Sequence, residues 1–319
     1  MLALGAGAIV PLISFAQRQG KLRRIGFLGP AALSATAHRV EGLRAGLREL
    51  GYVEGKNIAI EFRFADGKYE RLPELAAELV RLKVDLIVTH GTPATQAAQQ
   101  ATATIPIVIA TITDPVASGV VASLRQPGKN VTGVMVFTQE LNEKRLEMLR
   151  QVFPNAKRVA ILANADNVSM KSLAPALEAT GKALKLEVKR FDVRSPDEFE
   201  KAFSAMAAAR VDAVVPIEDA MLFTNDQALA DQAAKRRLPL IAWKEAAEKG
   251  GFLAYGVDFP DMFRRSASYV DRILKGARPA DLPMERSTKF ELLVNMKTAR
   301  SLGIKLPQSV LVRADRVIE

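Results

Sequence analysis

The two halves of this chain contain the same succession of short apolar segments. The matching pairs are residues 24–28 with 158–162, 84–88 with 211–215, and 105–108 with 238–241. Their order is the same and their offset is about 130 residues, several times the length of a solenoid repeat. This pattern indicates two similar α/β lobes. The strand-end loops of two open sheets can enclose a shared crevice, which is a place to bind a small molecule.

The length and composition allow two packed domains and exclude several kinds of chemistry. With 319 residues and 49% hydrophobic content, the chain can bury substantial cores. The absence of cysteine excludes disulfides, thiolate metal sites and a cysteine nucleophile. Only His38 and His90 could serve as histidine ligands, so we expect neither a metal nor a cofactor.

The net charge of +10 could suggest a nucleic-acid or anionic-surface partner. However, the basic residues are spread along amphipathic segments and interleaved with acids, as in Arg71, Glu74, Glu78 and Arg81. No helix-turn-helix pattern precedes the first expected strand, and no aromatic-basic array suggests base stacking. We therefore expect no nucleic-acid partner.

Residues 1–17 form an uncharged, mostly apolar leader, because the first charged side chain is Arg18. The leader is shorter than the roughly 20 residues that a membrane span needs. It is typical of the apolar region of a secretory signal, with Ser14 and Ala16 marking a small-x-small cleavage site. It lacks the basic region that normally comes first. Export to the periplasm is the leading interpretation, with an upstream start, an anchor or a buried arm as alternatives.

Short apolar runs alternate with longer stretches of helical period throughout the chain. Consecutive apolar, β-branched positions predict strands of parallel sheets that are covered on both faces. The expected strands are 24–28, 57–64, 85–89, 105–110, 131–136, 158–163, 187–192, 212–216, 240–243 and 252–255. The expected helices are 37–50, 69–82, 92–103, 142–153, 167–184, 196–210, 225–237 and 260–275, with Ser195 as an N-cap. The predicted fold class is α/β, with two doubly wound parallel-sheet lobes.

In the first half, two strand ends carry candidate ligand-binding groups. His90 and Gly91 lead from a strand into a helix that begins near Thr92, where free backbone N–H groups can face an anion. An ordinary capped turn is the alternative. Thr113 and Asp114 follow the next strand. Asp114 could accept a hydrogen bond from a ligand, but Asp before Pro is also a common turn device, so we favour a structural role for it and a ligand role for Thr113.

Polar strand ends recur in the second half. Asn164 and Asn167 follow its first strand, Glu218 and Asp219 its third, and Trp243 its fourth. A pocket aromatic supplies area and geometry for a ligand, although core packing is an open alternative for Trp243.

The sequence lacks four common catalytic or nucleotide-binding motifs. These are the Gly-x-Ser-x-Gly nucleophile turn of hydrolases, the Gly-Lys-Ser/Thr of phosphate loops, a Gly-x-Gly-x-x-Gly after the first strand, and the His-Glu-x-x-His of zinc proteases. The turn after the first strand, residues 29–34, includes Leu33 and also Pro30, which removes an N–H that a dinucleotide pyrophosphate would use.

The chain resembles the extracytoplasmic solute-binding proteins of bacterial ABC importers with the type I periplasmic-binding fold, in the tryptophan/tyrosine-type branch. The segments that carry the resemblance are 24–28, 42–44, 50–52, 113–116, 250–256, 271–276, 279–283 and 289–292. Phe252 and Ala254 depart from the Leu and Ser expected there, so the ligand's identity is not carried over.

The resemblance implies two lobes on a three-segment hinge. The expected lobes are 22–136 with 258–282, and 137–257 with 283–319. It also implies a ligand trapped by closure and delivery to a permease and its ATPase. We expect a monomer. The ligand-binding residues that the resemblance implies by position are Thr92, Thr95 and Thr113 of the first lobe, with Asn164, Asn167, Asp219, Trp243 and Tyr255 of the second. The predicted ligand-binding set also includes Leu33, Asp114 and Phe137.

The sequence is compatible with three functions. The leading one is a non-catalytic binder that traps an amino acid, an aromatic acid or another carboxylate. The second is an α/β enzyme with Asp114 or Glu218 as general base, which lacks a convergent nucleophile and oxyanion donors. The third is the ligand-sensing part of a transcription regulator, which lacks a DNA-binding headpiece in this sequence.

Overall fold

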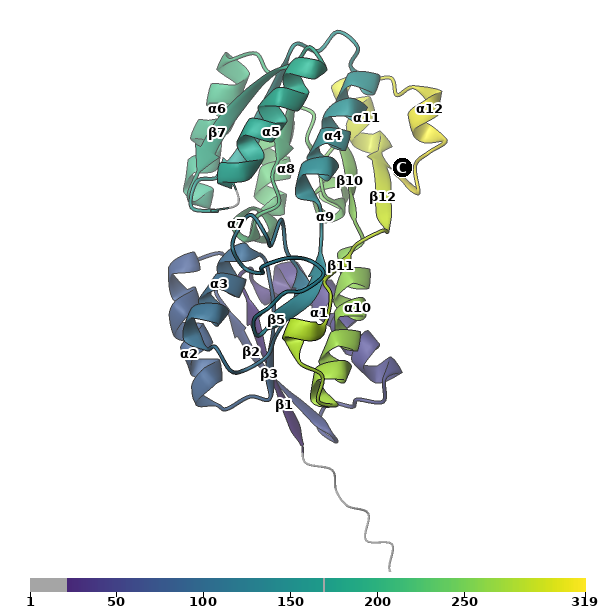
Figure 1. Ribbon diagram of the computed structural model, residues 1–319. Coiled ribbons are helices and arrows are strands. Elements are labelled where there is room, and N and C mark those ends of the chain that lie inside the picture. The colour runs from purple at the N-terminus through teal and green to yellow at the C-terminus, as the bar shows by residue number, and fades with distance from the viewer. Residues whose placement is uncertain (1–21, 169) are drawn as a thin grey trace, which may run out of the picture.

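The computed structural model describes residues 22–168 and 170–319, which form two α/β lobes stacked end to end (Figure 1). The first lobe contains six strands and four helices of the described chain. Its strands are β1 (Arg23–Gly29), β2 (Ile58–Phe64), β3 (Leu86–His90), β4 (Ile107–Thr111), β5 (Val131–Met135) and β11 (Glu285–Arg286). Its helices are α1 (Leu33–Glu49), α2 (Leu72–Arg81), α3 (Thr92–Ala101) and α10 (Phe259–Leu274).

The strands of the first lobe form one parallel sheet in the order β11-β5-β4-β3-β1-β2. Successive side chains of a strand point to opposite faces, so Ile25 and Phe27 pack with Val40 of α1, whereas Leu28 packs with Leu72 of α2. Helices α1 and α10 therefore cover one face, and α2 and α3 cover the other. This arrangement leaves the carboxyl ends of β3 and β4 facing the second lobe.

The second lobe is built from two strand groups joined by a bridge between Val214 and Leu240. Their orders are β7-β6-β8 and β13-β12-β10-β9. The strands are β6 (Arg158–Asn164), β7 (Glu187–Val193), β8 (Ala213–Pro216), β9 (Ile241–Ala242), β10 (Leu253–Val257), β12 (Phe290–Asn295) and β13 (Arg316–Ile318). The helices are α4 (Thr138–Val152), α5 (Met170–Ala183), α6 (Phe199–Ala208), α7 (Ala220–Thr224), α8 (Asp226–Lys235), α9 (Lys244–Glu248), α11 (Met296–Leu302) and α12 (Gln308–Leu311).

The chain crosses between the lobes after β5, after β10 and after β11. The pairing of β11 with β5 keeps residues 285–286 in the first sheet, beyond residue 282 where we expected the return to the second lobe. The pair β10–β12 is antiparallel, in contrast to the all-parallel sheet that we expected. The reason is connectivity, because β10 runs toward the first lobe and β12 comes back from it.

The strands and longer helices expected from apolar periodicity are present at the expected places. Ser195 differs from expectation, because it precedes a short 3-10 helix without a side-chain capping bond. Glu198 instead accepts a hydrogen bond from the backbone N–H of Arg194 at 2.7 Å. The predicted leader, residues 1–17, lies outside the described residues.

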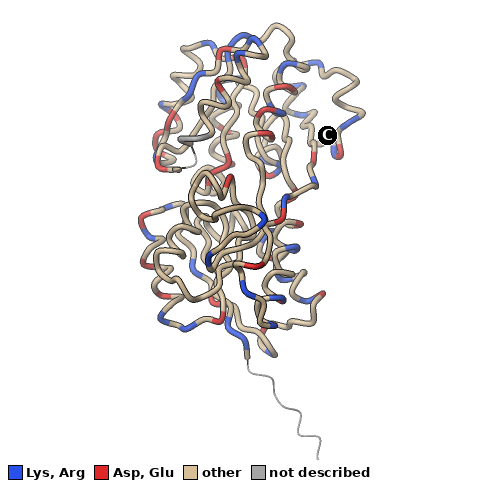
Figure 2. Tube along the Cα trace, in the orientation of Figure 1, with Lys and Arg blue, Asp and Glu red and all other residues tan. Residues whose placement is uncertain are grey.

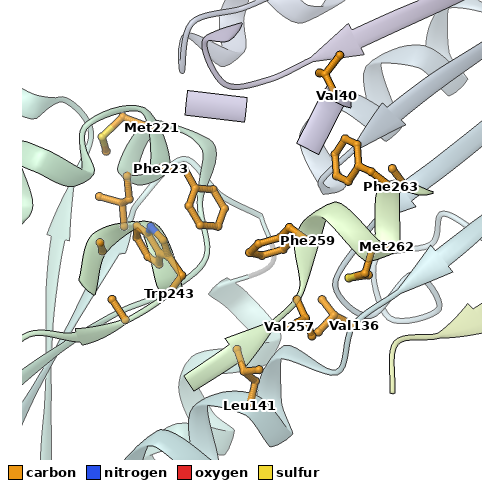
Figure 3. Packing of buried hydrophobic residues seen from close by; sticks show 14 of the residues in the cluster. Val40, Val136, Leu141, Met221, Phe223, Trp243, Val257, Phe259, Met262 and Phe263 are labelled. Atoms are coloured by element: carbon orange, nitrogen blue, oxygen red, sulfur yellow. The ribbon is translucent and has the colours of Figure 1, made fainter. Parts of the chain in front are cut away.

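A continuous apolar cluster links the lobes near the crossings (Figure 3). Phe223 of α7 lies edge-to-face with Phe259, the first residue of α10, at a centroid distance of 5.6 Å. Basic and acidic residues are interspersed over both lobes (Figure 2). The lobes therefore meet through an apolar contact beside the crossings, and neither lobe carries charged residues of one sign alone.

Candidate ligand-binding site

A cavity lies between the lobes, with an empty volume of about 560 Å³ including its opening to solvent. The first-lobe wall of the cavity is formed by α1, by a 3-10 turn before α2, and by the ends of β3 and β4 with the segments that follow them. Its residues include Arg39, Tyr69, His90, Thr92 and Thr113. Its second-lobe wall includes Asn167, Glu218, Asp219 and Phe223.

The turn from β3 into α3 brings the helix N-terminus to the cavity. Gly91 has a φ of 75°, a conformation that glycine adopts without strain. Its N–H donates to the Thr111 carbonyl at 2.8 Å, which ties the turn to β4. Thr113, beyond β4, shares a hydroxyl hydrogen bond of 2.6 Å with Thr138 at the start of α4. The first-lobe wall thus combines hydroxyls with the positive end of a helix dipole.

Asp219 is the centre of the second-lobe wall. Its Oδ1 accepts the backbone N–H of Met221 at 2.9 Å and so caps α7. The side-chain amides of Asn164 and Asn167 donate to its two oxygens at 3.1 and 2.9 Å. Burial raises the pKa of Asp219 above its usual value, although these hydrogen bonds oppose the rise. The carboxylate is therefore held in one fixed orientation.

The hydroxyl of Tyr69 donates to Asp219 across the gap between the lobes. Burial and the Asp219 charge raise the pKa of Tyr69 well above its usual value, so the hydroxyl stays protonated. A further cross-lobe bond runs from the Ala32 N–H to the Thr224 hydroxyl at 3.2 Å. The two lobes are thus in direct polar contact around the cavity.

Arg39 is a cation in the first-lobe wall, with 1% of its side chain exposed. Its guanidinium carbon lies 4.2 Å from the ring centre of Phe223 and 4.0 Å from that of Phe259. Its Nη2 lies 3.6 Å from Glu245, which also contacts His38. Burial lowers the pKa of Arg39, but arginine remains charged in proteins. This part of the cavity therefore carries a buried positive charge that contacts two aromatic rings.

His90 lines the cavity near Arg39. Burial, with the Arg39 charge, lowers the pKa of His90 to about 3, so its ring is neutral near pH 7. Its ring lies edge-on to Phe263 at 5.3 Å, which fixes the imidazole against α10. A neutral imidazole offers one N–H donor and one acceptor nitrogen.

Glu218 is paired with Arg145, whose Nη2 lies 2.6 Å from the carboxylate. Arg145 also donates to the Tyr255 carbonyl at 2.8 Å, which fixes α4 against β10. This pair places Glu218 as a structural anion at the cavity wall. Asp114, the other general-base candidate, is exposed and accepts the Ala117 N–H at 3.0 Å, in the turn role that we favoured.

Four of the predicted site residues line the cavity, namely Thr92, Thr113, Asn167 and Asp219. Asn164 lies directly behind Asp219. Thr95 is buried within α3, where its hydroxyl donates to the Gly91 carbonyl at 2.8 Å.

The remaining predicted residues lie outside the cavity lining. Trp243 is 1% exposed and packs in the core, edge-on to Phe223 at a centroid distance of 4.4 Å. Tyr255 stacks on Phe290. Leu33 is 49% exposed at the start of α1, and Phe137 packs beneath Arg286.

Sequence reasoning did not single out Arg39, Tyr69, Phe223 or Phe259. A signal for Arg39 existed, because it shares the 3–4 spacing of Thr36, Val40 and Leu43 on the apolar face of α1. A charged residue on an apolar stripe is buried among partners or ligands, whereas the other arginines of this helix lie off that stripe.

Among residues 22–168 and 170–319, no group of three or more His, Asp or Glu side chains could hold a metal ion. Within the same part of the chain, no helix combines the length and apolar character needed to cross a membrane.

Comparison with known proteins identifies the family. A family model described as ABC transporter substrate binding protein matches residues 28–318. The chain belongs to this family. Among known members of similar sequence is a "Tyrosine-binding protein" of Clostridioides difficile (strain R20291), 28% identical over 266 residues, which covers 83% of this chain and 76% of the relative. ABC substrate-binding proteins are extracytoplasmic, bind small ligands and deliver them to permease and ATPase subunits.

Two solved structures of ABC substrate-binding proteins show the same two-lobed type I periplasmic-binding fold. The first is the ABC domain in complex with L-Trp from Streptococcus pneumonia, with a TM-score of 0.86 and 28% identity over 93% of this chain and 100% of that chain. The second is the ligand-free, open structure of a substrate binding protein with adhesive properties from Clostridium difficile. Its TM-score is 0.68, with 26% identity over 93% of this chain and 99% of that chain.

Proposed function

We propose that this ABC substrate-binding protein captures a small organic acid or amino acid between its lobes by hinge closure, without transforming it. The observation that carries the proposal is the cavity between the lobes, whose polar wall groups come from both sides. A ligand that contacts both walls makes more contacts in the closed form than in the open form. It therefore shifts the equilibrium toward closure.

The lobe arrangement supports closure as the mechanism. Tyr69 and Ala32 of the first lobe form hydrogen bonds with Asp219 and Thr224 of the second. The TM-score to the L-Trp complex is higher than that to the ligand-free, open relative. Both facts fit a closed arrangement. Short crossings after β5, β10 and β11 could absorb the rotation that opens it.

The chemistry of the walls supports a small carboxylate as ligand. The α3 N-terminus, Thr92 and Thr113 suit a carboxylate, and the acidic side chains Glu218 and Asp219 suit donors such as an ammonium group. Two similar proteins are described as tyrosine-binding and as an L-Trp complex, which favours amino acids as the first ligands to test.

The remaining proposals concern processing and assembly. We infer that residues 1–17 act as a cleaved export signal, that the mature chain begins near Gln17, and that it works as a monomer beside its permease. The proposed lobes are 22–136 with 258–286, and 137–257 with 287–319. Mass spectrometry of the native protein tests the cleavage, and an intact leader would contradict it.

Thermal-shift screening of amino acids and small aromatic and aliphatic acids tests the function. A ligand at 100 times its dissociation constant adds about 2.7 kcal/mol of stability. Chromatography then recovers the ligand after incubation. We expect at least one stabilising compound, recovered unchanged. A chemically altered compound would favour the enzyme alternative, and no stabilisation by any compound would contradict the proposal.

A further inference from the structure

Arg39 has hydrogen-bonding capacity that the described chain does not use. Its Nε and Nη1 atoms are buried and have no hydrogen-bond partner among residues 22–168 and 170–319. Glu245 is the ionic partner of Arg39, with its carboxylate 3.6 Å from Nη2. A buried donor without an acceptor is costly, and the cost is larger for a charged group. An acceptor is therefore missing at this point of the cavity wall.

His90 shows the same deficiency in the same cavity. Its Nε2 is buried and also has no hydrogen-bond partner within the described chain. Arg39 and His90 both line the space between the lobes. Arg39 is a donor in every state, and His90 is a donor when its proton is on Nε2, so one acceptor from outside the chain can satisfy both groups.

The surroundings of Arg39 define what this acceptor can be. The guanidinium carbon lies 4.2 Å from the ring centre of Phe223 and 4.0 Å from that of Phe259, and the two rings contact each other edge-to-face. The guanidinium therefore covers one side of this ring pair, and a ligand ring cannot stack on that side while Arg39 keeps this position. The charged groups Glu218 and Asp219 lie on the second-lobe wall. The wall charges therefore orient an anionic group of the ligand toward Arg39.

We propose that Arg39, assisted by His90, is the specificity-determining residue that binds the acidic group of the ligand. This inference rests on the proposed function, since it assigns one end of the same ligand. Charge-assisted hydrogen bonds from a guanidinium to a carboxylate are stronger than bonds to a neutral amide. The site should therefore discriminate between an acid and its carboxamide of nearly the same shape.

The test compares acid and amide pairs by calorimetric titration. The probes are L-tyrosine and L-tyrosinamide, L-tryptophan and L-tryptophanamide, L-glutamate and L-glutamine, and 4-hydroxybenzoate and 4-hydroxybenzamide. In the unmodified protein we expect the acid of at least one pair to bind ten times more tightly than its amide or better. Equal or tighter binding of the amide in every pair that binds would overturn the inference but leave the proposed function intact. No binding by any probe would overturn the inference, whereas the proposed function would be overturned only if the thermal-shift screen also found no ligand.

The variants separate ligand binding from closure. Arg39→Gln should reduce the acid-to-amide preference to less than threefold. Glu245→Gln is the matched control, because it removes the ionic partner of Arg39 across the lobes but keeps the guanidinium. If Arg39 acts on the ligand, Glu245→Gln keeps the preference even where both affinities change. An equal loss of preference in both variants, or a preference that survives in Arg39→Gln, would overturn the inference.

A third variant covers the case in which Arg39→Gln does not fold. Arg39→Lys keeps a positive charge but loses Nε and the planar group. We expect the acid-to-amide preference to fall at least threefold, with cooperative thermal unfolding retained. An unchanged preference in Arg39→Lys would overturn the role of the guanidinium donors.

Discussion

Trp243 is the largest of the fully buried side chains among the described residues. It lies behind Phe223, so it supports the cavity wall from the core. We expect Trp243→Ala to lower the free energy of unfolding by about 3–5 kcal/mol, because it removes a large core side chain. Urea unfolding measures this change. A variant with normal stability and weakened ligand binding would instead favour the pocket role predicted from the sequence.

Trp243→Phe is the matched control for this prediction. The indole N–H has no hydrogen-bond partner within residues 22–168 and 170–319, so phenylalanine loses volume but no bond. We expect a smaller loss of stability than in the alanine variant.

His90 should make the stability of the protein depend on pH. Its pKa is about 3 in the folded protein and near 6.5 when unfolded. Between these values the unfolded chain binds a proton that the folded protein does not, so stability is full above about pH 6.5 and falls as the pH is lowered toward 3. The full difference corresponds to about 5 kcal/mol.

The measurement is chemical unfolding without ligand at several pH values from 7 to 4, in the unmodified protein and in His90→Gln. We expect His90→Gln to show a shallower loss of stability with acid. The carboxylates contribute in both proteins, so only the difference between them reports on His90. Identical pH profiles would contradict the prediction.

At the scale of elements, α1 and α10 pack so closely that a glycine is required between them. A Cβ built on Gly46 would lie 2.2 Å from the Arg264 carbonyl oxygen of α10. We expect Gly46→Ala to destabilise the protein by about 1–3 kcal/mol, because the helices must separate. Ala37→Gly, an exposed change in the same helix, measures the helix-propensity effect of about 1 kcal/mol alone. Thermal unfolding of both variants decides whether packing outweighs propensity.

The elements that could be predicted from the sequence are those whose own periodicity defines them. The buried runs of β1 and β3, and the amphipathic pattern of α10, are visible without any tertiary information. The short helices α7 and α9 were missed because five residues are too few to show a period. The strand β12 was missed because it is defined by its antiparallel pairing with β10. That pairing depends on the path of the chain as it crosses from the first lobe back to the second after β11, which no local pattern shows.

Some residues of the candidate site could likewise be predicted from the sequence, and others could not. The strand-end positions of Thr92, Thr113, Asn167 and Asp219 follow from the parallel α/β pattern, because loops at carboxyl ends of strands meet at one edge. Arg39 reaches the cavity only because α1 of the first lobe lies against α7 and α9 of the second. No local pattern contains that contact.

At the scale of the whole molecule, closure depends on a small number of polar contacts between the lobes. The bond from Tyr69 to Asp219 joins the first lobe directly to the cap of α7. A bond present in the closed form and absent in the open form stabilises closure by its full net contribution, about 1.5–3 kcal/mol for a charged acceptor. Removing it should therefore shift the equilibrium toward the open form.

We expect the ligand found by thermal-shift screening to decrease the radius of gyration of the unmodified protein, measured by small-angle scattering. Tyr69→Phe should need a higher ligand concentration to reach the same compact state, because the ligand must then supply more of the closing free energy. Tyr52→Phe is the matched control, since its hydroxyl donates at 2.9 Å to Asp271 within the first lobe. If Tyr52→Phe shifts the titration as much as Tyr69→Phe, the cross-lobe bond does not control closure. A radius of gyration unchanged by a tightly bound ligand would reject hinge closure itself, because contacts made equally in both forms shift no equilibrium.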